Sequence, residues 1–371
     1  MVGDANSVHI HGFIKAMKQK DPELIIDVFA VIPVIRIPEF ADNVIEIKLL
    51  SWYVKYINKG TRFIIFLPLF IWHRFFLKNY DTIFIHFIVP YYHNFVKYYN
   101  KRCKTLVSVF WGSDLFRIKK KDIPKVLKIV GMSDVVNLAT PEMYKEFLHT
   151  FNMSSCIKRT NYSFGIEILN DIKTVIKKGV NRQRFIAKLS CSVKITAETK
   201  IVTIGYNGAP QQQHLKIIED LENREWRNTL FIFPITYAGT KEYHSEIKRK
   251  LERSSLNWIL IPEFMTNKQI SNLRFVTDVF IQLQTTDGLS VATQEHIFAG
   301  NRVIVGSWLP YKMFKEMGIF YQTVDTVSEI SEKLKEELSL GPLSQAMKDI
   351  NRNAIAKFSD WEYVIEPWLK L

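Results

Sequence analysis

The stretch VFIQLQTTDGLSVATQEHIFAGNRVIV, residues 279–305, contains the pattern that decides the fold. It begins with the apolar run Val279–Leu283, continues through a polar loop and a helical pattern that ends at Ala299-Gly300, and closes on a second apolar run, Arg302–Val305. A strand buried on both faces has this near-continuous apolar character. A helical pattern between two such runs therefore predicts a parallel strand–helix–strand unit.

The same alternation extends along the chain. Further apolar, β-branched runs occur at Ile25–Val31, Thr82–Phe87, Thr105–Phe110, Val135–Leu138, Lys200–Ile204, Thr229–Phe233 and Trp258–Ile261. A chain of 371 residues exceeds the size of one hydrophobic core. We therefore predict an α/β protein with two Rossmann-like domains, residues 1–185 and 186–355, whose parallel sheets face each other across a cleft. A C-terminal helix over 356–371 can pack back onto the first domain.

The composition excludes several classes of protein. The 47% hydrophobic and 23% charged residues are typical of a globular chain. Three widely spaced cysteines, Cys103, Cys156 and Cys191, fit neither a disulfide framework nor a zinc site, so we expect a reducing compartment and no metal. The longest apolar run, Phe63–Trp72, is too short for a transmembrane helix, which needs about 20 residues, and no secretory leader is evident. The sequence predicts a cytoplasmic protein.

The net charge of +13 is unevenly distributed along the sequence. Residues 1–190 hold 29 Lys and Arg against 15 Asp and Glu, whereas residues 191–371 hold 21 against 22. This asymmetry favours a polyanionic partner for the first half. Aromatic and basic residues alternate over 48–78, as on a surface that lies on an anionic membrane, with a buried core helix as an equal alternative. No nucleic-acid-binding motif is present, so no nucleic-acid partner is expected.

Two polar motifs of the first half lie where strands should end. Gly3-Asp4-Ala5-Asn6-Ser7 follows a first strand reduced to Met1-Val2, and Trp111-Gly112-Ser113-Asp114 follows the run at 105–110. Simple capped turns are the alternative interpretation of both motifs. The candidates for a catalytic base are Asp4, His9 and Asp114, and the candidates for acceptor binding are Asn6, Ser7, His11, Trp111, Gly112 and Ser113.

The polar motifs of the second half suit a nucleotide sugar. The turn Gly205–Gly208 opens the helix that starts near His214, where a diphosphate can rest on backbone amides. Asp287 and Glu295 are predicted to point into one pocket, where carboxylates accept hydrogen bonds from hydroxyls, although two surface acids are the alternative. The donor-binding candidates are Gly205, Asn207, Gly208, His214, Thr236, Tyr237, Asp287, Gly288, Leu289, Ser290 and Glu295.

With these residues in place, the chain resembles the GT-B glycosyltransferases, in particular glycosyltransferase family 4. That family carries Glu-x7-Glu ahead of a helix ending in Ala-x-Gly, and Asp287-x7-Glu295 with Ala299-Gly300 is similar. The resemblance implies that Asp287 contacts the donor sugar and that Glu295 holds the ribose hydroxyls. Gln211–His214 stand where the family has a basic diphosphate clamp, so Lys268, Arg274 or Lys312 is expected to replace it.

A second resemblance is to the bacterial transferases that add acetamido-fucose to lipid-linked enterobacterial common antigen. The segments 111–115, 205–214 and 233–237 are similar to segments of that group. Together the resemblances imply transfer of a sugar from a nucleotide-sugar co-substrate, with no other cofactor, to a lipid-linked or polysaccharide acceptor in bacterial surface glycan synthesis. Retention and inversion both stay open. The alternative is a noncatalytic nucleotide-sugar-binding or partner subunit of the same fold.

Overall fold

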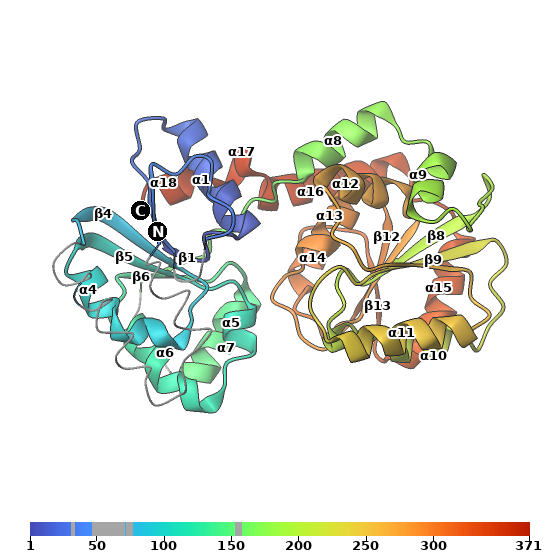
Figure 1. The fold of residues 1–371 in the computed structure, drawn as a ribbon, viewed down its shortest axis with the longest axis horizontal. Coiled ribbons are helices and arrows are strands. Elements are labelled where there is room, and N and C mark those ends of the chain that lie inside the picture. The colour runs from blue at the N-terminus through green and yellow to red at the C-terminus, as the bar shows by residue number, and fades with distance from the viewer. Residues whose placement is uncertain (31–33, 47–70, 72–76, 153–157) are drawn as a thin grey trace. The chain divides into compact units, whose positions relative to one another are not determined.

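The computed structural model describes residues 1–30, 34–46, 71, 77–152 and 158–371. The chain divides into two compact units, which we call unit 1 (Met1–Glu167 with Phe358–Leu371) and unit 2 (Ile168–Lys357). In each unit, helices cover both faces of a parallel sheet (Figure 1). Both units are therefore three-layered α/β structures.

The sheet of unit 1 has seven described strands in the order β3-β2-β1-β4-β5-β6-β7. These are β1 (Val2–Gly3), β2 (Asp27–Ala30), β3 (Asn43–Glu46), β4 (Tyr80–His86), β5 (Cys103–Val109), β6 (Val135–Asn137) and β7 (Arg159–Thr160). The central strand β1 pairs in parallel with β2 on one side and β4 on the other. The direction of winding thus reverses between β1 and β4, which makes this pair a topological switch point.

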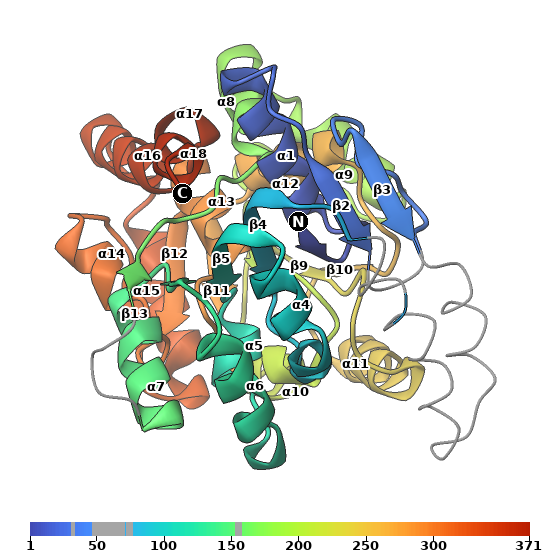
Figure 2. The same ribbon diagram turned by 90° about the vertical axis from the view of Figure 1, so that its left-hand side faces the viewer.

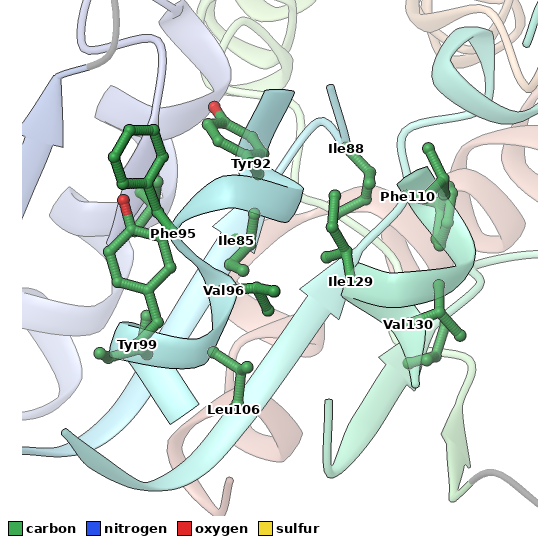
Figure 3. Packing of buried hydrophobic residues seen from close by; sticks show 14 of the residues in the cluster. Ile85, Ile88, Tyr92, Phe95, Val96, Tyr99, Leu106, Phe110, Ile129 and Val130 are labelled. Atoms are coloured by element: carbon green, nitrogen blue, oxygen red, sulfur yellow. The ribbon is translucent and has the colours of Figure 1, made fainter. Parts of the chain in front are cut away.

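The two faces of this sheet bury different side chains of the same strands. Ile83 and Ile85 face one core, and Phe84 between them faces the other, as the two-residue period of a strand requires. Figure 3 shows the first core, where Ile85 and Leu106 pack with Val96 and Ile129. The helices over this core are α4 (Val96–Asn100), α5 (Ser113–Phe116), α6 (Ile123–Val130) and α7 (Pro141–Phe151), with the short turns η1 (Pro90–Asn94) and η2 (Lys120–Asp122). Figure 2 shows α4 and α6 on the side of β4 and β5 opposite α1 (Val8–Lys20).

The C-terminal residues complete the second core of unit 1. The short helices α17 (Trp361–Val364) and α18 (Glu366–Leu369) lie beside α1 in Figure 1. Trp368 is 1% exposed, and its ring contacts those of Phe13 and Phe84 edge-on. Its indole nitrogen donates to the carbonyl oxygen of Ser163 at 3.0 Å. The end of the chain is therefore a structural part of the first unit.

The sheet of unit 2 has six described strands in the order β10-β9-β8-β11-β12-β13. They are β8 (Lys200–Ile204), β9 (Thr229–Pro234), β10 (Trp258–Ile261), β11 (Val279–Gln282), β12 (Arg302–Gly306) and β13 (Gln322–Val324). Counted from β8, this is the strand order 3-2-1-4-5-6 of a dinucleotide-binding sheet, and its switch point lies between β8 and β11.

Two groups of helices sandwich this second sheet (Figures 1 and 2). One face carries α8 (Leu169–Lys178), α9 (Arg182–Leu189), α12 (Asn267–Val276) and α13 (Val291–Ala299). The other carries α10 (His214–Leu221), α11 (Lys241–Arg253) and α15 (Ile330–Ser339). The remaining described helices are α14 (Lys312–Glu316), α16 (Gln345–Ser359) and the turns η3 (Pro210–Gln212) and η4 (Val327–Glu329).

Helices α8 and α9 pack within unit 2, so the division falls between residues 167 and 168, whereas the sequence suggested 185 and 186. The buried Phe185 and Ile186 of α9 join the core beneath α12. This placement changes the charge distribution, because both helices are rich in Lys and Arg. Unit 1 holds 24 Lys and Arg against 17 Asp and Glu, a net charge of +7, and unit 2 holds 26 against 20, a net charge of +6. The two units therefore have nearly equal net charges, although the two halves of the sequence differ strongly in net charge.

Among the described residues, no helix has both the length and the apolar character needed to cross a bilayer. The same part of the chain contains no group of three or more His, Cys, Asp or Glu side chains arranged to hold a metal ion. Most of the aromatic and basic segment 48–78 lies outside the described residues.

Candidate functional site

The predicted site residues lie in the loops that leave the carboxyl ends of the strands, or in the helices that follow these loops. In unit 1 they follow β1 and β5, and in unit 2 they follow β8, β9 and β11. Loops that leave a switch point run in opposite directions and leave a crevice in which ligands of open α/β sheets bind. The topology therefore places the candidates of each unit at one edge of its sheet.

Close packing requires glycine at two positions of the turn after β8. Gly205 has φ +64°, and a Cβ atom there would lie 3.0 Å from Oε1 of Gln212 and 3.1 Å from Nε2 of His214. A Cβ atom at Gly208 would lie only 2.0 Å from Nε2 of His244. The Gly208 N–H donates to the carbonyl oxygen of Tyr237 at 2.8 Å, so this turn is fastened to the loop after β9. The backbone at these two glycines can approach the neighbouring side chains closely because glycine has no Cβ atom.

The ring of His214 lies beneath this turn and is 0% exposed. Burial, and secondarily the neighbouring His244, lowers the pKa of His214 to about 3, so its imidazole is neutral. Neither ring nitrogen has a hydrogen-bond partner within the described structure. Burial raises the pKa of Tyr243, while hydrogen bonds from the backbone N–H groups of His214 and Leu215 lower it. The Tyr243 hydroxyl thus lies at the start of α10, where the sequence predicted phosphates.

Glu295 lies in the second turn of α13 and is paired with a buried arginine. Its Oε2 accepts a hydrogen bond from Nε of Arg274 at 2.9 Å, and both side chains are less than a tenth exposed. Burial raises the pKa of Glu295, and the Arg274 cation opposes this shift. Arg274, considered above as a diphosphate clamp, is therefore tied to the acid that we expected to hold ribose.

Asp287 is half-buried in the loop after β11. Its Oδ2 accepts a hydrogen bond from the Tyr311 hydroxyl, whose oxygen accepts the Ser290 N–H at 3.3 Å. Burial, and then the Asp287 charge, raises the pKa of Tyr311 well above its ordinary value. Ser290 also caps α13 by accepting the Thr293 N–H. Gly288, which is buried, and Leu289, which is half-buried, complete this loop.

Tyr237 shows that these segments converge. Burial raises the pKa of its hydroxyl and a hydrogen bond with Asn207 lowers it, while the charges of Glu295, Arg274 and Asp287 all act on it. Residues from two other loops and two helices therefore act on one phenol. Its ring is stacked on Phe264, with centroids 6.0 Å apart and an interplanar angle of 10°. Thr236, the preceding residue, is half-buried.

In unit 1, the motif after β1 is bound largely to itself. Asp4 Oδ1 accepts the backbone and side-chain N–H groups of Asn6 at 2.9 and 3.0 Å. Asn6 in turn accepts the N–H groups of residues 35 and 36. Ser7 caps α1 by accepting the His9 N–H, and Nε2 of His11 lies 2.7 Å from the carbonyl oxygen of Ala5. These contacts favour the capped-turn interpretation for Asp4, Asn6, Ser7 and His11.

Asp114 joins the loops after β4 and β5. Its buried carboxylate accepts the Ile88 N–H at 2.7 Å and the Trp111 N–H at 2.9 Å. Burial raises the pKa of Asp114 to about 6 and outweighs these amides, which lower it. Gly112 caps α5 with φ +102°, and Ser113 is its first residue. Asp114 thus holds the two loops together.

A cluster of aromatic side chains lies beside the two loops that Asp114 joins. The Trp111 ring contacts the rings of His9 and Phe87 edge-on, at 5.2 and 5.9 Å between centroids. Phe87 has φ +56°, a strained conformation for a residue without glycine's freedom, and strain of this kind is concentrated at functional sites. His86, the last residue of β4, is fully buried, and burial lowers its pKa to about 3. The sequence patterns singled out neither Phe87 nor His86.

Solved structures of other proteins match the entire chain. An α,α-trehalose-phosphate synthase (UDP-forming) from Burkholderia vietnamiensis is 10% identical over 100% of this chain and 96% of its own, with a TM-score of 0.69. HepE from Anabaena, in complex with UDP and glucose, is 12% identical over 100% and 97% with a TM-score of 0.67. The N-terminal domain of Candida albicans trehalose-6-phosphate phosphatase is 9% identical over 100% and 95% with a TM-score of 0.69.

The chain has the GT-B fold. The prediction of an α/β protein with two Rossmann-like domains is confirmed, and identities this low establish the fold alone. No protein-family model and no curated protein matches the sequence. The likenesses to family 4 and to the acetamido-fucose transferases stay predictions.

Proposed function

We propose that this chain is a glycosyltransferase whose nucleotide-sugar donor binds at the carboxyl edge of the second sheet. The observation that supports it most is that the charges of Asp287 and Glu295, which come from a loop and a helix, both act on the hydroxyl of Tyr237. Each acid is held by a buried partner, Tyr311 and Arg274 respectively. Carboxylates fixed in this way accept hydrogen bonds from hydroxyl groups with little further loss of conformational freedom.

The two acids have different roles in this proposal. Glu295 accepts hydrogen bonds from the ribose diol, and Asp287, nearer to solvent, contacts the sugar to be transferred. The exposed faces of Tyr237 and Phe264 offer aromatic surface to the nucleobase. Lys268, in the first turn of α12, and Lys312, in the first turn of α14, are exposed and can approach the diphosphate, while Arg274 is tied to Glu295.

The acceptor belongs to the first unit in this proposal. His9 is the best-suited base among Asp4, His9 and Asp114. Burial lowers the pKa of His9, so its imidazole is neutral and able to take a proton. Asp114 already accepts two backbone N–H groups, and Asp4 is bound to Asn6. An inverting reaction requires such a base and a retaining reaction does not, so a product of retained anomeric configuration would exclude this role for His9.

We further propose a lipid-linked or polysaccharide acceptor of the bacterial cell surface, with a membrane-facing basic surface on unit 1. The support is a run of exposed cations around η2 and α6, namely Arg117, Lys119, Lys120, Lys121, Lys125 and Lys128. Asp122 pairs with Lys125 at 3.1 Å. Flotation with phosphatidylglycerol vesicles should show binding that weakens with salt and with charge reversal at 119–121, and little binding to phosphatidylcholine. Binding that ignores lipid charge and salt would contradict this proposal.

The central experiment measures donor binding before turnover. Calorimetry with UDP, GDP, dTDP and CDP should reveal one preferred diphosphate, and a radiolabelled sugar nucleotide should then release that diphosphate in the presence of acceptor. If the wild-type protein binds none of the four, the proposed function is wrong. Tight binding without release of the diphosphate, even with membrane extract as acceptor, would instead establish a noncatalytic nucleotide-binding subunit.

A further inference from the structure

A continuous chain of buried hydrogen bonds starts at Glu295 and leads away from the candidate site. Arg274 Nε donates to Glu295 at 2.9 Å, and Arg274 Nη1 lies 3.0 Å from Nε2 of His296. His296 Nδ1 lies 2.8 Å from Oδ1 of Asn301, whose Nδ2 donates to the carbonyl oxygen of Thr277. Thr277 contributes its backbone oxygen, and the other residues contribute the polar ends of their side chains. All five residues are buried. The chain links α12 and α13 to the residue that follows α12.

The direction of every bond in this chain is determined by its two ends. A guanidinium group can only donate, so Nε2 of His296 must accept from Arg274. The hydrogen of the neutral ring is then on Nδ1, which donates to Oδ1 of Asn301. The Asn301 amide nitrogen is left to donate to Thr277. Burial, and then the Arg274 charge, lowers the pKa of His296 well below its ordinary value, in agreement with a neutral ring.

The His296 ring is also fixed by packing. It is stacked on Phe280 of β11, with centroids 3.9 Å apart and an interplanar angle of 10°. Arg274 is therefore held by protein groups alone, in the orientation in which Nε meets Glu295. It binds Oε2 of the carboxylate. A cation of this kind stabilises the ionised form of a buried carboxylate. Without a partner, a buried carboxylate takes up a proton and becomes neutral.

We propose that Arg274 is a positioning residue that keeps Glu295 ionised and oriented to receive the ribose diol of the donor. This inference rests on the proposed function, in which Glu295 is the ribose-binding acid. Arg274 acts through Glu295 and does not touch the nucleotide. The anchor formed by His296, Asn301 and Thr277 holds Arg274 in place before any ligand arrives, so no ligand-binding energy is used to arrange the acid.

Other titratable groups around Glu295 should affect its ionisation less than Arg274 does. They are His296 on the same helix, Tyr237 and Asp287 in the neighbouring loops, and Asp171, Lys173 and Lys177 on α8, which packs against α13. The α8 side chains are exposed or half-exposed, and His296 is neutral. Arg274 is the buried cation in contact with the carboxylate, so its removal should alter the ionisation of Glu295 most.

The test is UDP binding by calorimetry from pH 7 to 9.5, or binding of whichever of the four diphosphates the wild-type protein prefers. Arg274→Met keeps the length of the side chain without its charge. We expect about tenfold weaker binding at pH 7, with recovery as the pH rises, because the pKa of Glu295 increases without its cation and the acid ionises only at higher pH. Arg274→Lys should restore most of the affinity at pH 7. The double variant Arg274→Met/Glu295→Gln should lose the recovery with pH.

Arg302→Met is the matched control. Arg302 forms another buried pair, with Glu337 at 2.7 Å, between β12 and α15. Its loss should lower the unfolding temperature without adding a pH dependence to binding. Wild-type affinity of Glu295→Gln would refute the ribose contact and hence the proposed site. Weak binding by Glu295→Gln combined with a pH-independent loss in Arg274→Met, or no loss, would overturn the positioning inference alone.

Discussion

The hydroxyl group of Tyr311 binds the carboxylate of Asp287 while its oxygen accepts the backbone N–H of Ser290. One buried phenol therefore connects the loop after β12 with the loop after β11 and with the first turn of α13. Asp287 is 24 residues away along the chain, and its orientation depends on a residue of another loop. The contact places an acid at the solvent side of the loop without leaving it free to rotate.

Tyr311→Phe should lower turnover without weakening diphosphate binding. The ring stays in the core, but Asp287 loses a hydrogen bond to a charged group, typically worth about 1.5–3 kcal/mol, so we expect kcat/KM to fall about tenfold or more. Steady-state kinetics with the sugar nucleotide and calorimetry with the diphosphate separate the two effects. Tyr321→Phe is the control, because the Tyr321 hydroxyl donates to the backbone oxygen of Tyr311 at 2.9 Å rather than to an acid. An equal loss in both variants would indicate general loosening of the core.

Neutralising Glu295 and neutralising Asp287 should impair different properties, namely diphosphate binding and turnover. Glu295→Gln removes the charge that strengthens hydrogen bonds to the ribose, so the nucleoside diphosphate should bind about tenfold or more weakly. Asp287→Asn should leave diphosphate affinity nearly unchanged and lower kcat, because its contact is with the sugar as it reacts. Calorimetry and kinetics on the same preparations test both. If both variants bind and turn over like wild type, these residues have been assigned wrongly.

The central strands could be predicted from sequence because each is apolar on both faces. The predicted runs at 200–204, 229–233 and 258–261 match β8, β9 and β10 to within one residue. The strands β3, β7 and β13 were missed. They are two to four residues long, lie at or near the sheet edges and contain polar residues such as Asn43, Arg159 and Gln322. A short edge strand has one paired neighbour and little burial, so no apolar run marks it.

The positions of the site loops could also be predicted, because they follow from where strands end. The partners within the site could not. Arg274 and Glu295 are 21 residues apart and belong to different helices, and Tyr311 reaches Asp287 from a third segment. The spacing of residues along one helix predicts contacts within that helix, whereas these contacts depend on how α12, α13 and the loop before α14 pack. The sequence also did not indicate that His214, a polar residue beside a glycine turn, is wholly buried.

Gly208→Ala should weaken diphosphate binding more than binding of the free nucleoside. The new Cβ atom would lie 2.0 Å from Nε2 of His244, whose ring is held 2.8 Å from the carbonyl oxygen of Ala238, so the turn must shift. Such overpacking typically costs about 1–3 kcal/mol. His244→Ala in the same chain should restore part of the affinity, and His244→Ala alone is the control. Equal losses for diphosphate and nucleoside, unrelieved by His244→Ala, would place the phosphates elsewhere.

The buried carboxyl group of Asp114 should make stability depend on pH in a direction opposite to that of an exposed salt-bridged acid. Burial raises its pKa from 3.8 to about 6, so the folded protein holds this proton more tightly than the unfolded chain. The resulting stabilisation is fully present below about pH 4 and is lost as the pH rises through about 6. A shift of this size corresponds to about 3 kcal/mol, at roughly 1.4 kcal/mol per pKa unit. Asp114→Asn cannot titrate and presents an amide to the Ile88 and Trp111 N–H groups, so it should be less stable than wild type at pH 4. The difference in unfolding free energy between the two proteins, measured by chemical denaturation from pH 4 to 8, should therefore shrink between pH 4 and 6 and then stay constant. A difference that grows with pH would mean that the two backbone amides outweigh burial and that Asp114 is an ionised acid in the folded protein.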